Sequence, residues 1–529
     1  MRILTASDRA LLIEARDLDE AMRLNLAWDG VPGVVERIPG ARTVLVRFDP
    51  LRTSASELAA VLAATEIGTG DLPSAGEVTV PVRYDGEDLD EAASLLGLSA
   101  DELIRRHLAA DWQVAFSGFA PGFGYVVSGD PLFDVPRRSS PRTRVPAGSV
   151  ALAGAFTGVY PRESPGGWQL IGRTDAAMWD IDRDPPALLS PGALVRFTRA
   201  ERDAIRAGSG SPSSAGGPNQ RDDRSEAPTP SDDPRSPAVE VVRPSLQLLV
   251  QDAGRPGYAA LGVSASGAAD RQAMRDANRA VGNRAEAAVL ESVGGAVLRF
   301  HGEGVAVVTG AIGDLLLADA QGTGRDVAPG VPFATVDGDE LTLGHPSHGL
   351  RYVIGVRGGI AAAPALDSRA ADTLAGLGPA ALAAGDAVAI GADAPHSVEP
   401  LPVPRALPAP GDLVDLEITL GPRDDWFTPA ARDALTTQEW TITPRSDRVG
   451  IRLHGDVPLE RSRSGELPSE GAVTGAIQVP PDGQPVLFLP DHPLTGGYPI
   501  IGAVTDRSLD LAGQLPPGAR IRFVLKEFS

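Results

Sequence analysis

The sequence predicts a mainly β protein with a small α/β unit at its N-terminus. Of the 529 residues, 60 are glycine and 47 are proline, which favours many tight turns over long helices. From about Trp112 onward, short apolar segments alternate with glycine and proline, a pattern typical of barrels and sandwiches. A turn-rich phrase also occurs twice. The length indicates about three or four compact units.

The first unit, residues 1–75, is predicted to contain a strand, a helix, a pair of strands and a second helix. These segments are ALLIEA, LDEAMRLNLAW, GVVERIPGARTVLVRFD and SASELAAVLAA. In the last segment, Ser54 and Glu57 have the spacing of a capping box. Ser99 and Glu102 repeat that spacing before another amphipathic helix, LSADELIRRHLAA.

Two larger β regions follow, separated by a segment that we expect to be a disordered linker. Residues 208–238 contain almost no apolar side chain and cannot bury enough surface to offset their ordering entropy. We expect one β domain over 76–207 and another over 239–529. The second includes a helix, DRQAMRDANRAVGN, and the strands AVLRF, VAVVTGA and LRYVIGVRGG. This organisation indicates two separate proteins fused by a tether.

Charge and hydropathy exclude several classes of function. The formal net charge of -21 argues against a nucleic-acid or anionic-membrane binder, because such partners require a positive surface. No apolar run is long enough to cross a bilayer, and the first residues, MRILTASDRALLIEARD, become charged too early for a secretory signal. We therefore expect a cytoplasmic protein.

Two residue types are informative through their scarcity. The chain has no cysteine, so disulfides, thiolate zinc sites and cysteine nucleophiles are excluded. Its single lysine is Lys526, which excludes an internal Schiff-base lysine, a Walker-type phosphate lysine and an internal site for covalent biotin. Arginine must supply the cations of any site.

The repeated phrase indicates a duplicated β domain. VPAGSVALAGAFTGVYP at 145–161 and VPPDGQPVLFLPDHPLTGGYP at 479–499 each begin with Val-Pro and a glycine turn and end with Thr-Gly-x-Tyr-Pro. Each half then ends alike, with PGALVRF at 191–197 and PGARIRF at 517–523. The individual pieces also fit a purely structural interpretation, since glycine and proline mark turns.

A binding function is predicted most clearly for the continuation of the first copy, ESPGGWQLIGRT. Bare glycine amides beside Ser164, Gln169, Arg173 and Thr174 would form a backbone cradle for an oxyanion or a phosphate.

Several longer motifs resemble a known family. FSGFAPGFGYV (116–126), PRTRVPAGSVALAG (141–154) and SPGGWQLIGRT (164–174) are similar to the B subunit of 5-oxoprolinase, also described as allophanate hydrolase subunit 1 and as a sporulation-kinase inhibitor. Motifs in the second half resemble the C subunit of the same enzyme. They are QDAGRPGYAALGVSASGAAD, ANRAVGN, SDRVGIRL, GAIQVPPDGQP and TGGYP. This B/C pair also resembles the carboxyltransferase region of urea amidolyase.

The resemblance implies a fold, an activity and a partner. It implies cyclophilin-like β-barrels in both halves behind a ferredoxin-like N-terminal unit. It also implies a hydrolase component that uses ATP and Mg²⁺ to open 5-oxoproline to glutamate, with the A subunit of 5-oxoprolinase as its partner. Ser117, Gly124 and Ile500 depart from the family pattern, and Ile500 stands where many relatives have lysine.

A lactam is a poor electrophile, so phosphoryl transfer to its amide oxygen would create a leaving group for attack by water. Such a site needs donors for phosphate oxygens and a cation for the substrate carboxylate. Taking the turns and the resemblance together, we expect catalytic roles for Arg173, Gln169, Asp252, Arg255 and Asp482. Binding roles are expected for Arg142, Arg144, Ser149, Ser164, Gly166, Gly167, Thr174, Gln251, Ser266, Asp270, Asn278, Arg448, Gln478, Gln484 and Tyr498.

Some alternatives remain open at the level of sequence. Asp252 with Arg255, and Asp447 with Arg448, also fit turn-fixing ion pairs. His345 and His348 lack an evident third ligand, so no resident metal site is expected. The competing functions are a carboxyltransferase that takes carboxybiotin supplied in trans, and a non-catalytic inhibitor of a histidine kinase. The B-like and C-like halves are expected to associate, and a homo-oligomer is compatible with the sequence.

Overall fold

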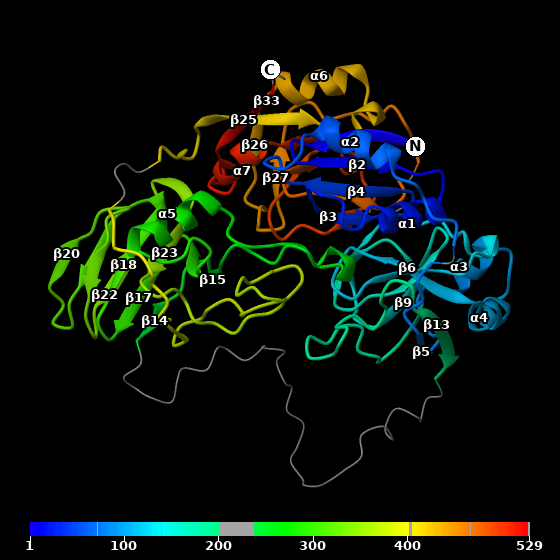
Figure 1. The fold of residues 1–529 in the computed structure, drawn as a ribbon, viewed down its shortest axis with the longest axis horizontal. Helices are drawn as coiled ribbons and strands as arrows, with labels where there is room; N and C mark the ends of the chain where they lie inside the picture. The colour runs from blue at the N-terminus through cyan, green and yellow to red at the C-terminus, as the bar shows by residue number, and fades with distance from the viewer. Residues whose placement is uncertain (71, 139, 201–236, 401–404, 466, 527–529) are drawn as a thin grey trace, which may run out of the picture.

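The computed structural model describes residues 1–70, 72–138, 140–200, 237–400, 405–465 and 467–526. They form four bodies. The N-terminal unit and the C-terminal barrel lie together at the top of Figure 1, with a second barrel and a β-sandwich below them on opposite sides. The expected linker, 208–238, lies outside the described residues as far as residue 236, and Ala238 begins strand β14.

The N-terminal unit is an antiparallel sheet of order β1-β2-β4-β3 with two helices on one face. Its elements are β1 (Arg2–Ser7), β2 (Ala10–Glu14), α1 (Leu18–Ala27), β3 (Val34–Pro39), β4 (Thr43–Phe48) and α2 (Ala55–Ala64). The predicted capping box at Ser54 is present. Along β2, Leu11 and Ile13 pack beneath the helices, whereas Ala10 and Leu12 face the C-terminal barrel. Successive side chains of a strand point to opposite faces, so this alternation is expected of a strand that is buried on both faces.

The second body is a nearly closed barrel of order β12-β9-β10-β7-β6-β13-β5. Its elements are β5 (Glu77–Val82), α3 (Leu89–Leu95), α4 (Ala100–Ala109), β6 (Trp112–Ser117), β7 (Gly124–Val127), the 3₁₀ turn η1 (Pro131–Phe133), β8 (Arg142–Val145), β9 (Ser149–Ala153), β10 (Phe156–Val159), β11 (Ser164–Gly166), β12 (Gln169–Arg173) and β13 (Leu194–Arg199). Arg83 and Arg173 exchange two backbone hydrogen bonds of 2.8 Å, which join the strands at the two ends of the sheet.

The third body, shown green in Figure 1, is a sandwich of two sheets with one shared core. Its elements are β14 (Ala238–Arg243), β15 (Gln247–Gln251), α5 (Arg271–Val281), β16 (Val289–Val293), β17 (Val297–His301), β18 (Gly304–Ile312), β19 (Leu315–Ala318), β20 (Gly324–Asp326), β21 (Phe333–Thr335), β22 (Glu340–Leu343), β23 (His348–Val356) and β24 (Ala387–Ala389). The 3₁₀ turn η3 (Ala259–Leu261), in the loop after β15, packs instead against β3 and β6 of the first two bodies. Helix α5 packs on the outer face of the sheet that contains β18 and β23. The helix is capped at its C-terminus by Gly282, whose φ of 76° is left-handed.

The fourth body is a closed barrel of order β25-β32-β29-β30-β27-β26-β33. Its elements are β25 (Leu413–Leu420), η4 (Asp424–Trp426), α6 (Pro429–Thr437), β26 (Trp440–Ile442), β27 (Gly450–His454), β28 (Glu470–Gly471), β29 (Ala476–Gln478), β30 (Val486–Phe488), β31 (Thr495–Gly496), β32 (Ile500–Val504), α7 (Asp506–Ala512) and β33 (Arg520–Leu525). The prediction of a mainly β chain with two barrels is confirmed.

The two barrels follow the same plan. In each, the first strand pairs in parallel with the last: β5 with β13, and β25 with β33. In each, a helix precedes a buried tryptophan whose indole N–H donates to a carbonyl five residues earlier. These bonds join Trp112 to His107 at 2.8 Å and Trp440 to Leu435 at 3.0 Å. Shared strand order and a shared local bond support a duplicated domain. The repeated phrase does not mark equivalent positions, however, because residues 495–499 lead into β32 as residues 164–168 lead into β12.

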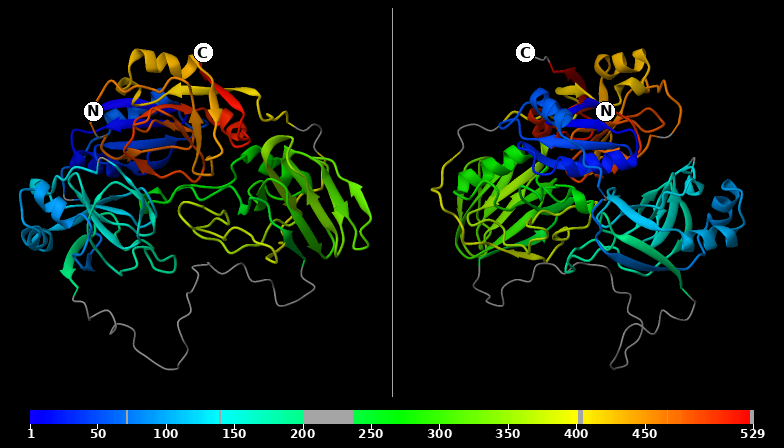
Figure 2. Two further views of the ribbon diagram at one scale, coloured as in Figure 1. Left: turned by 180° about the vertical axis from the view of Figure 1, so that it is seen from behind. Right: turned by 45° about the vertical axis from the view of Figure 1, so that its right-hand side comes forward.

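The N-terminal unit joins the C-terminal barrel, although they stand at opposite ends of the sequence. Both views in Figure 2 show the two side by side. A common apolar cluster includes Leu12 and Leu45 from the unit and Phe488 and Ile500 from the barrel. At the edge of this cluster, buried Arg423 of the barrel forms ion pairs with Glu14 of the unit and with Glu470. This contact brings the second barrel, which follows the unit, close to the C-terminal barrel.

Candidate functional site

The two copies of the repeated phrase face each other across one pocket, which we call the interbarrel pocket. It has a volume of about 430 Å³. From the first copy and its continuation it is lined by Tyr160 and by residues 165–168, and from the second copy by residues 495–498. The strands β10, β11 and β31 position these segments, because each segment belongs to a strand or to the turn that follows it.

Thr495 holds the two barrels together beside the pocket. Its buried hydroxyl accepts a hydrogen bond of 2.9 Å from the backbone N–H of Phe119 and lies 3.2 Å from the hydroxyl of Tyr125. A Cβ at Gly118 would lie 2.5 Å from the Thr495 hydroxyl, so only glycine fits at this approach. Thr157 has the same place in the first copy of the phrase but lies in the barrel strand β10, and it bonds within its own barrel, to His107 and to a backbone carbonyl.

One wall of the pocket is aromatic. The rings of Phe123 and Trp168 are 5.2 Å apart, and those of Phe123 and Tyr160 are 5.3 Å apart, both edge to face. Burial raises the pKa of Tyr160 above its ordinary value. A planar ring of a ligand can pack against this wall.

The positively charged part of the lining consists of three arginines, Arg137, Arg138 and Arg461. Arg138 donates to buried Asp88 at 2.7 Å, and Arg137 donates to the hydroxyl of Ser469 at 3.0 Å. The guanidinium of Arg461 lies 5.7 Å from the ring centre of Tyr498. Arg461 donates to a backbone carbonyl, and burial lowers its pKa. These groups can bind a carboxylate or a phosphoryl oxygen.

Among the described residues, no aspartate or glutamate lines the interbarrel pocket. Within the described ranges, no group of three or more histidine, aspartate or glutamate residues could hold a metal ion. The pocket therefore suits an anion with an apolar ring, and its described lining does not fit a resident Mg²⁺, which prefers carboxylate oxygens.

Of the residues expected from sequence, the structure brings four into the interbarrel pocket. They are Gly166, Gly167, Gln478 and Tyr498. A Cβ at Gly166 would overlap the hydroxyl of Tyr160, so this glycine permits the close packing of the pocket wall. Two other predicted groups of the first half are buried without a hydrogen-bond partner among the described residues, the Ser164 hydroxyl and the Gln169 side-chain carbonyl. Neither lines the pocket.

The predicted arginines of the first half form ion pairs outside the pocket. Arg173 pairs with Asp85 at 2.6 Å, and its side chain is 61% exposed. Arg142 pairs with Asp88 at 2.8 Å, and Arg144 pairs with Glu163 at 2.6 Å.

The other predicted residues near these turns make local bonds. The Ser149 hydroxyl donates to the carbonyl of Pro146, and the Thr174 hydroxyl accepts from the N–H of Ala176.

Most predicted residues of the second half lie in a buried polar network between the sandwich and the C-terminal barrel. Arg448 is fully buried and pairs with Asp491 at 3.0 Å and with Glu291 at 2.5 Å, and these charges raise its pKa. The nearby Ser266 donates to Asp491 at 2.7 Å. Four further predicted residues are buried around this junction: Gln251, Asp252, Arg255 and Asp270. Asn278 is also buried, but it donates to the carbonyls of Ala285 and Ala287 within the sandwich, at the C-terminal end of α5.

The contacts of these residues indicate a structural role. Asp252 accepts from the Ser368 hydroxyl and from two backbone N–H groups, and Arg255 donates to backbone carbonyls. Asp270 caps helix α5, and burial raises its pKa. Asp482 and Gln484 share a surface turn next to the pocket.

Sequence reasoning missed the three arginines of the pocket and its aromatic wall. Arg137 and Arg138 stand directly before the motif that begins at Pro141, so the run PRR was a usable signal. Arg461 lies in a charged segment, LERSRSGE, that matched no motif. Nothing in the sequence indicated that it approaches Tyr498.

The fold and the pocket define a class of protein in which a duplicated pair of β-barrels shares one cleft. The chain belongs to the carboxyltransferase domain family. The family model for subdomains A and B of the carboxyltransferase domain matches residues 261–525, and that for subdomains C and D matches residues 1–189.

Curated relatives divide the chain in the same way. The C subunit of 5-oxoprolinase from Escherichia coli (strain K12) is 34% identical over 298 residues, which are 54% of this chain and 90% of the relative. The B subunit of 5-oxoprolinase from Escherichia coli O157:H7 is 41% identical over 172 residues, which are 32% of this chain and 78% of the relative. The resemblance inferred from the motifs is confirmed.

Solved structures extend the likeness to the whole chain. The crystal structure of TTHA0988 has a TM-score of 0.79 at 34% identity and covers 98% of this chain and 100% of that one. The Kluyveromyces lactis urea carboxylase has a TM-score of 0.51 at 28% identity and covers 56% of this chain and 28% of that one. Among the described residues, the chain has no helix long and apolar enough to cross a membrane.

Proposed function

We propose that this protein is a component of an ATP-dependent 5-oxoprolinase, which couples hydrolysis of ATP to opening of 5-oxoproline to glutamate. The observation that carries the proposal is the composition of the interbarrel pocket. The half that is similar to the B subunit of 5-oxoprolinase and the half that is similar to the C subunit of that enzyme each supply part of the lining. One chain would therefore perform the role that two separate proteins share in Escherichia coli.

The lining suits the substrate of this reaction. The five-membered ring would pack against Phe123 and Trp168, and its carboxylate would bind the guanidinium groups of Arg138 and Arg461. Backbone N–H groups of the glycines in both copies would face the lactam. Exclusion of water by the aromatic wall would strengthen these interactions, because they act in a medium of low dielectric constant.

ATP and Mg²⁺ are assigned to the partner in this proposal. The described lining of the interbarrel pocket offers no carboxylate ligand for Mg²⁺. We therefore place the metal and the nucleotide on a protein like the A subunit of 5-oxoprolinase, which would meet this chain. The arginines of the pocket would hold the substrate while it is activated. The expected catalytic roles of Arg173, Gln169, Asp252, Arg255 and Asp482 remain predictions.

A coupled assay tests the proposed function. Full-length protein is mixed with an A-subunit-like partner, ATP and Mg²⁺, and the release of ADP and glutamate is measured with and without 5-oxoproline. We expect both products only when 5-oxoproline and both proteins are present. Failure of product release under all metal conditions would contradict the proposal.

The second candidate is a carboxyltransferase that takes carboxybiotin in trans. It is favoured by the match to the Saccharomyces cerevisiae urea amidolyase, which is 31% identical over 308 residues, although the match covers only 16% of that protein. The same preparation, supplied with a carboxylated biotin carrier and urea, would then consume the carboxybiotin. This outcome without 5-oxoproline turnover would replace the first proposal.

A further inference from the structure

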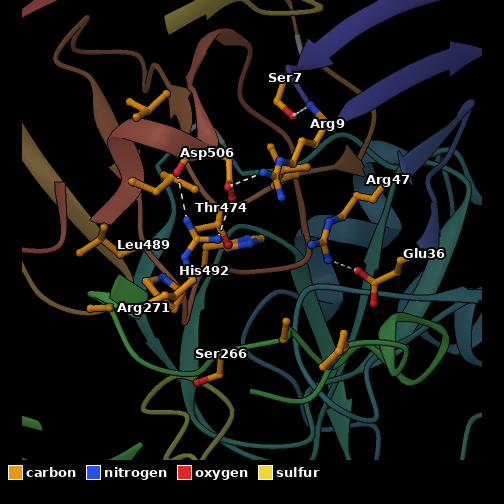
Figure 3. Close-up of a pocket in the computed structure, with 18 of the residues that line it drawn as sticks. Ser7, Arg9, Glu36, Arg47, Ser266, Arg271, Thr474, Leu489, His492 and Asp506 are labelled. Atoms are coloured by element: carbon orange, nitrogen blue, oxygen red, sulfur yellow. Dashed lines mark hydrogen bonds and ion pairs between the residues drawn. The ribbon is translucent and has the colours of Figure 1, made fainter. Parts of the chain in front are cut away.

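A second cavity, of about 250 Å³, lies between the N-terminal unit, the loop after β15 and the C-terminal barrel (Figure 3). Arg9, Glu36 and Arg47 of the unit line it on one side, and Thr474 and His492 of the barrel line it on the other. We call it the unit–barrel cavity. Among the described residues, none lines both this cavity and the interbarrel pocket.

One segment of the barrel, residues 489–498, separates the two sites. Leu489, Pro490, His492 and Leu494 face the unit–barrel cavity. Pro493 and residues 495–498 face the interbarrel pocket. Because neighbouring residues of one segment point to opposite sides, the two hollows are distinct spaces divided by a single layer of chain.

The unit–barrel cavity has more hydrogen-bond donors than its own carboxylates use. Asp506 accepts from Arg9 and from Arg271, each at 2.7 Å. Glu36 accepts from Arg47 at 2.7 Å and from a backbone N–H. An arginine has five N–H donors, and Arg47 makes only this one side-chain hydrogen bond within the described part of the chain. Asp8, the third carboxylate of the lining, accepts from the backbone N–H of Asp506 at 3.3 Å and lies 3.7 Å from the ammonium of Lys526. The three carboxylates thus have partners, whereas guanidinium donors of Arg47 remain for a ligand.

His492 supplies an acceptor in the same cavity. Its residue is 5% exposed, and burial lowers its pKa to about 4, so the imidazole is neutral at pH 7. Nδ1 lies 3.0 Å from the carbonyl oxygen of Pro493, which fixes the proton on that nitrogen. Nε2 is then an acceptor, and no hydrogen bond from the described residues occupies it. The ring is held in place by stacking on Phe488, with centroids 5.5 Å apart.

Thr474 adds a hydroxyl between these groups. It is half-buried in the lining and makes no hydrogen bond to any of the described residues. A guanidinium with free donors, a hydroxyl and a neutral imidazole acceptor therefore surround one small space.

We propose that the unit–barrel cavity is a second ligand site, for a small carboxylate that also carries an N–H group. The carboxylate binds Arg47 and the hydroxyl of Thr474, and the N–H donates to Nε2 of His492. Lactams with a carboxylate and α-amino acids both have this chemistry. The site needs no ATP, no Mg²⁺ and no partner to bind its ligand.

Nitrogen-15 NMR of the histidine side chains tests this site directly. The chain has only 7 histidines, so the full-length protein labelled at histidine gives a sparse spectrum. His492→Gln assigns the signal, and Phe488→Leu, which alters the stacked ring, provides a second assignment. The probe is 5-oxo-L-proline, a choice that rests on the proposed function. Cyclopentanecarboxylate, which has the same ring size and carboxylate without the N–H, is the matched control ligand.

We expect 5-oxo-L-proline to shift the Nε2 signal of His492 saturably, and cyclopentanecarboxylate to leave it unchanged. Arg47→Gln should weaken this binding by about tenfold or more, since a charge-assisted bond is lost, and Thr474→Val by about three- to tenfold. Arg461→Gln, which alters only the interbarrel pocket, should leave the titration of His492 unchanged.

Three results would overturn the proposal. The first is a His492 signal that no concentration of 5-oxo-L-proline moves. The second is an equal shift with cyclopentanecarboxylate, and the third is equal weakening by Arg461→Gln and Arg47→Gln. Because the titration does not depend on turnover, its failure is distinguishable from failure of the proposed function.

Discussion

Replacing Thr495 with valine should loosen the junction between the two barrels. Valine has nearly the shape of threonine, so the substitution removes the hydroxyl without opening a large cavity. The N–H of Phe119 and the hydroxyl of Tyr125 then lose their shared partner in a buried setting. The structure thus allows the effect to be attributed to one atom.

The expected magnitude follows from the loss of these contacts. Leaving a buried polar group unpaired costs about 1–3 kcal/mol, so we expect the junction to weaken by about 2 kcal/mol. Since 1.4 kcal/mol is a factor of ten, amide hydrogen exchange at Phe119 should accelerate by about thirtyfold. Hydrogen exchange followed by mass spectrometry over residues 116–126 measures this change.

Thr157→Val provides a matched control. It removes the threonine hydroxyl at the same place in the first copy of the phrase, whose bonds to His107 and to the carbonyl of Ala151 lie within one barrel. We expect exchange at Phe119 to remain as in the unaltered protein. If Thr495→Val leaves the protection of Phe119 unchanged, or if Thr157→Val reduces it equally, the junction does not depend on the Thr495 hydroxyl.

Four further results are expected. Arg461→Gln should lower kcat/KM for 5-oxoproline about tenfold or more in the coupled assay with an unchanged melting temperature, whereas Arg463→Gln, at a side chain 53% exposed, should not. Arg448→Met should lower the free energy of unfolding by about 3–5 kcal/mol in thermal denaturation, because buried Asp491 loses its paired arginine and Glu291 keeps only the longer contact of 3.6 Å to Arg351. Burial raises the pKa of Asp372 to about 6, so the native state binds more protons than the unfolded state between about pH 4 and pH 6. Stability from this group should therefore fall as pH rises through that window, and denaturant titrations of Asp372→Asn should lack this component. Arg173→Ala should change stability by less than about 1 kcal/mol, because it removes an exposed ion pair, and its turnover decides whether the catalytic role expected from sequence holds.

The sequence predicted the fold better than the site. The repeated phrase and its shared flanks predicted two related barrels, and the strand β2 and helix α5 lie where periodicity and capping placed them. Periodicity and turn residues are local properties, so they are visible without knowledge of which strands pair. By contrast, β1 was not predicted.

The site depends on contacts between residues far apart in the chain. Glycines 166 and 167 were predicted because they lie inside a motif, whereas Arg461 reaches the pocket only because two barrels meet at Thr495. Arg448 was expected to bind a ligand, but its partners Asp491 and Glu291 come from different bodies and bury it completely. The sequence alone does not distinguish an arginine that is buried in an ion pair from one that binds a ligand. The distinction depends on how the surrounding residues pack.

A crystal structure of the full-length protein with 5-oxo-L-proline tests the central claim most directly. We predict density for the ligand in the interbarrel pocket, with its ring against Trp168 and its carboxylate within hydrogen-bond distance of Arg138 or Arg461. The prediction concerns this pocket whether or not the unit–barrel cavity is also occupied. An interbarrel pocket that stays empty in crystals saturated with 5-oxo-L-proline would contradict the account.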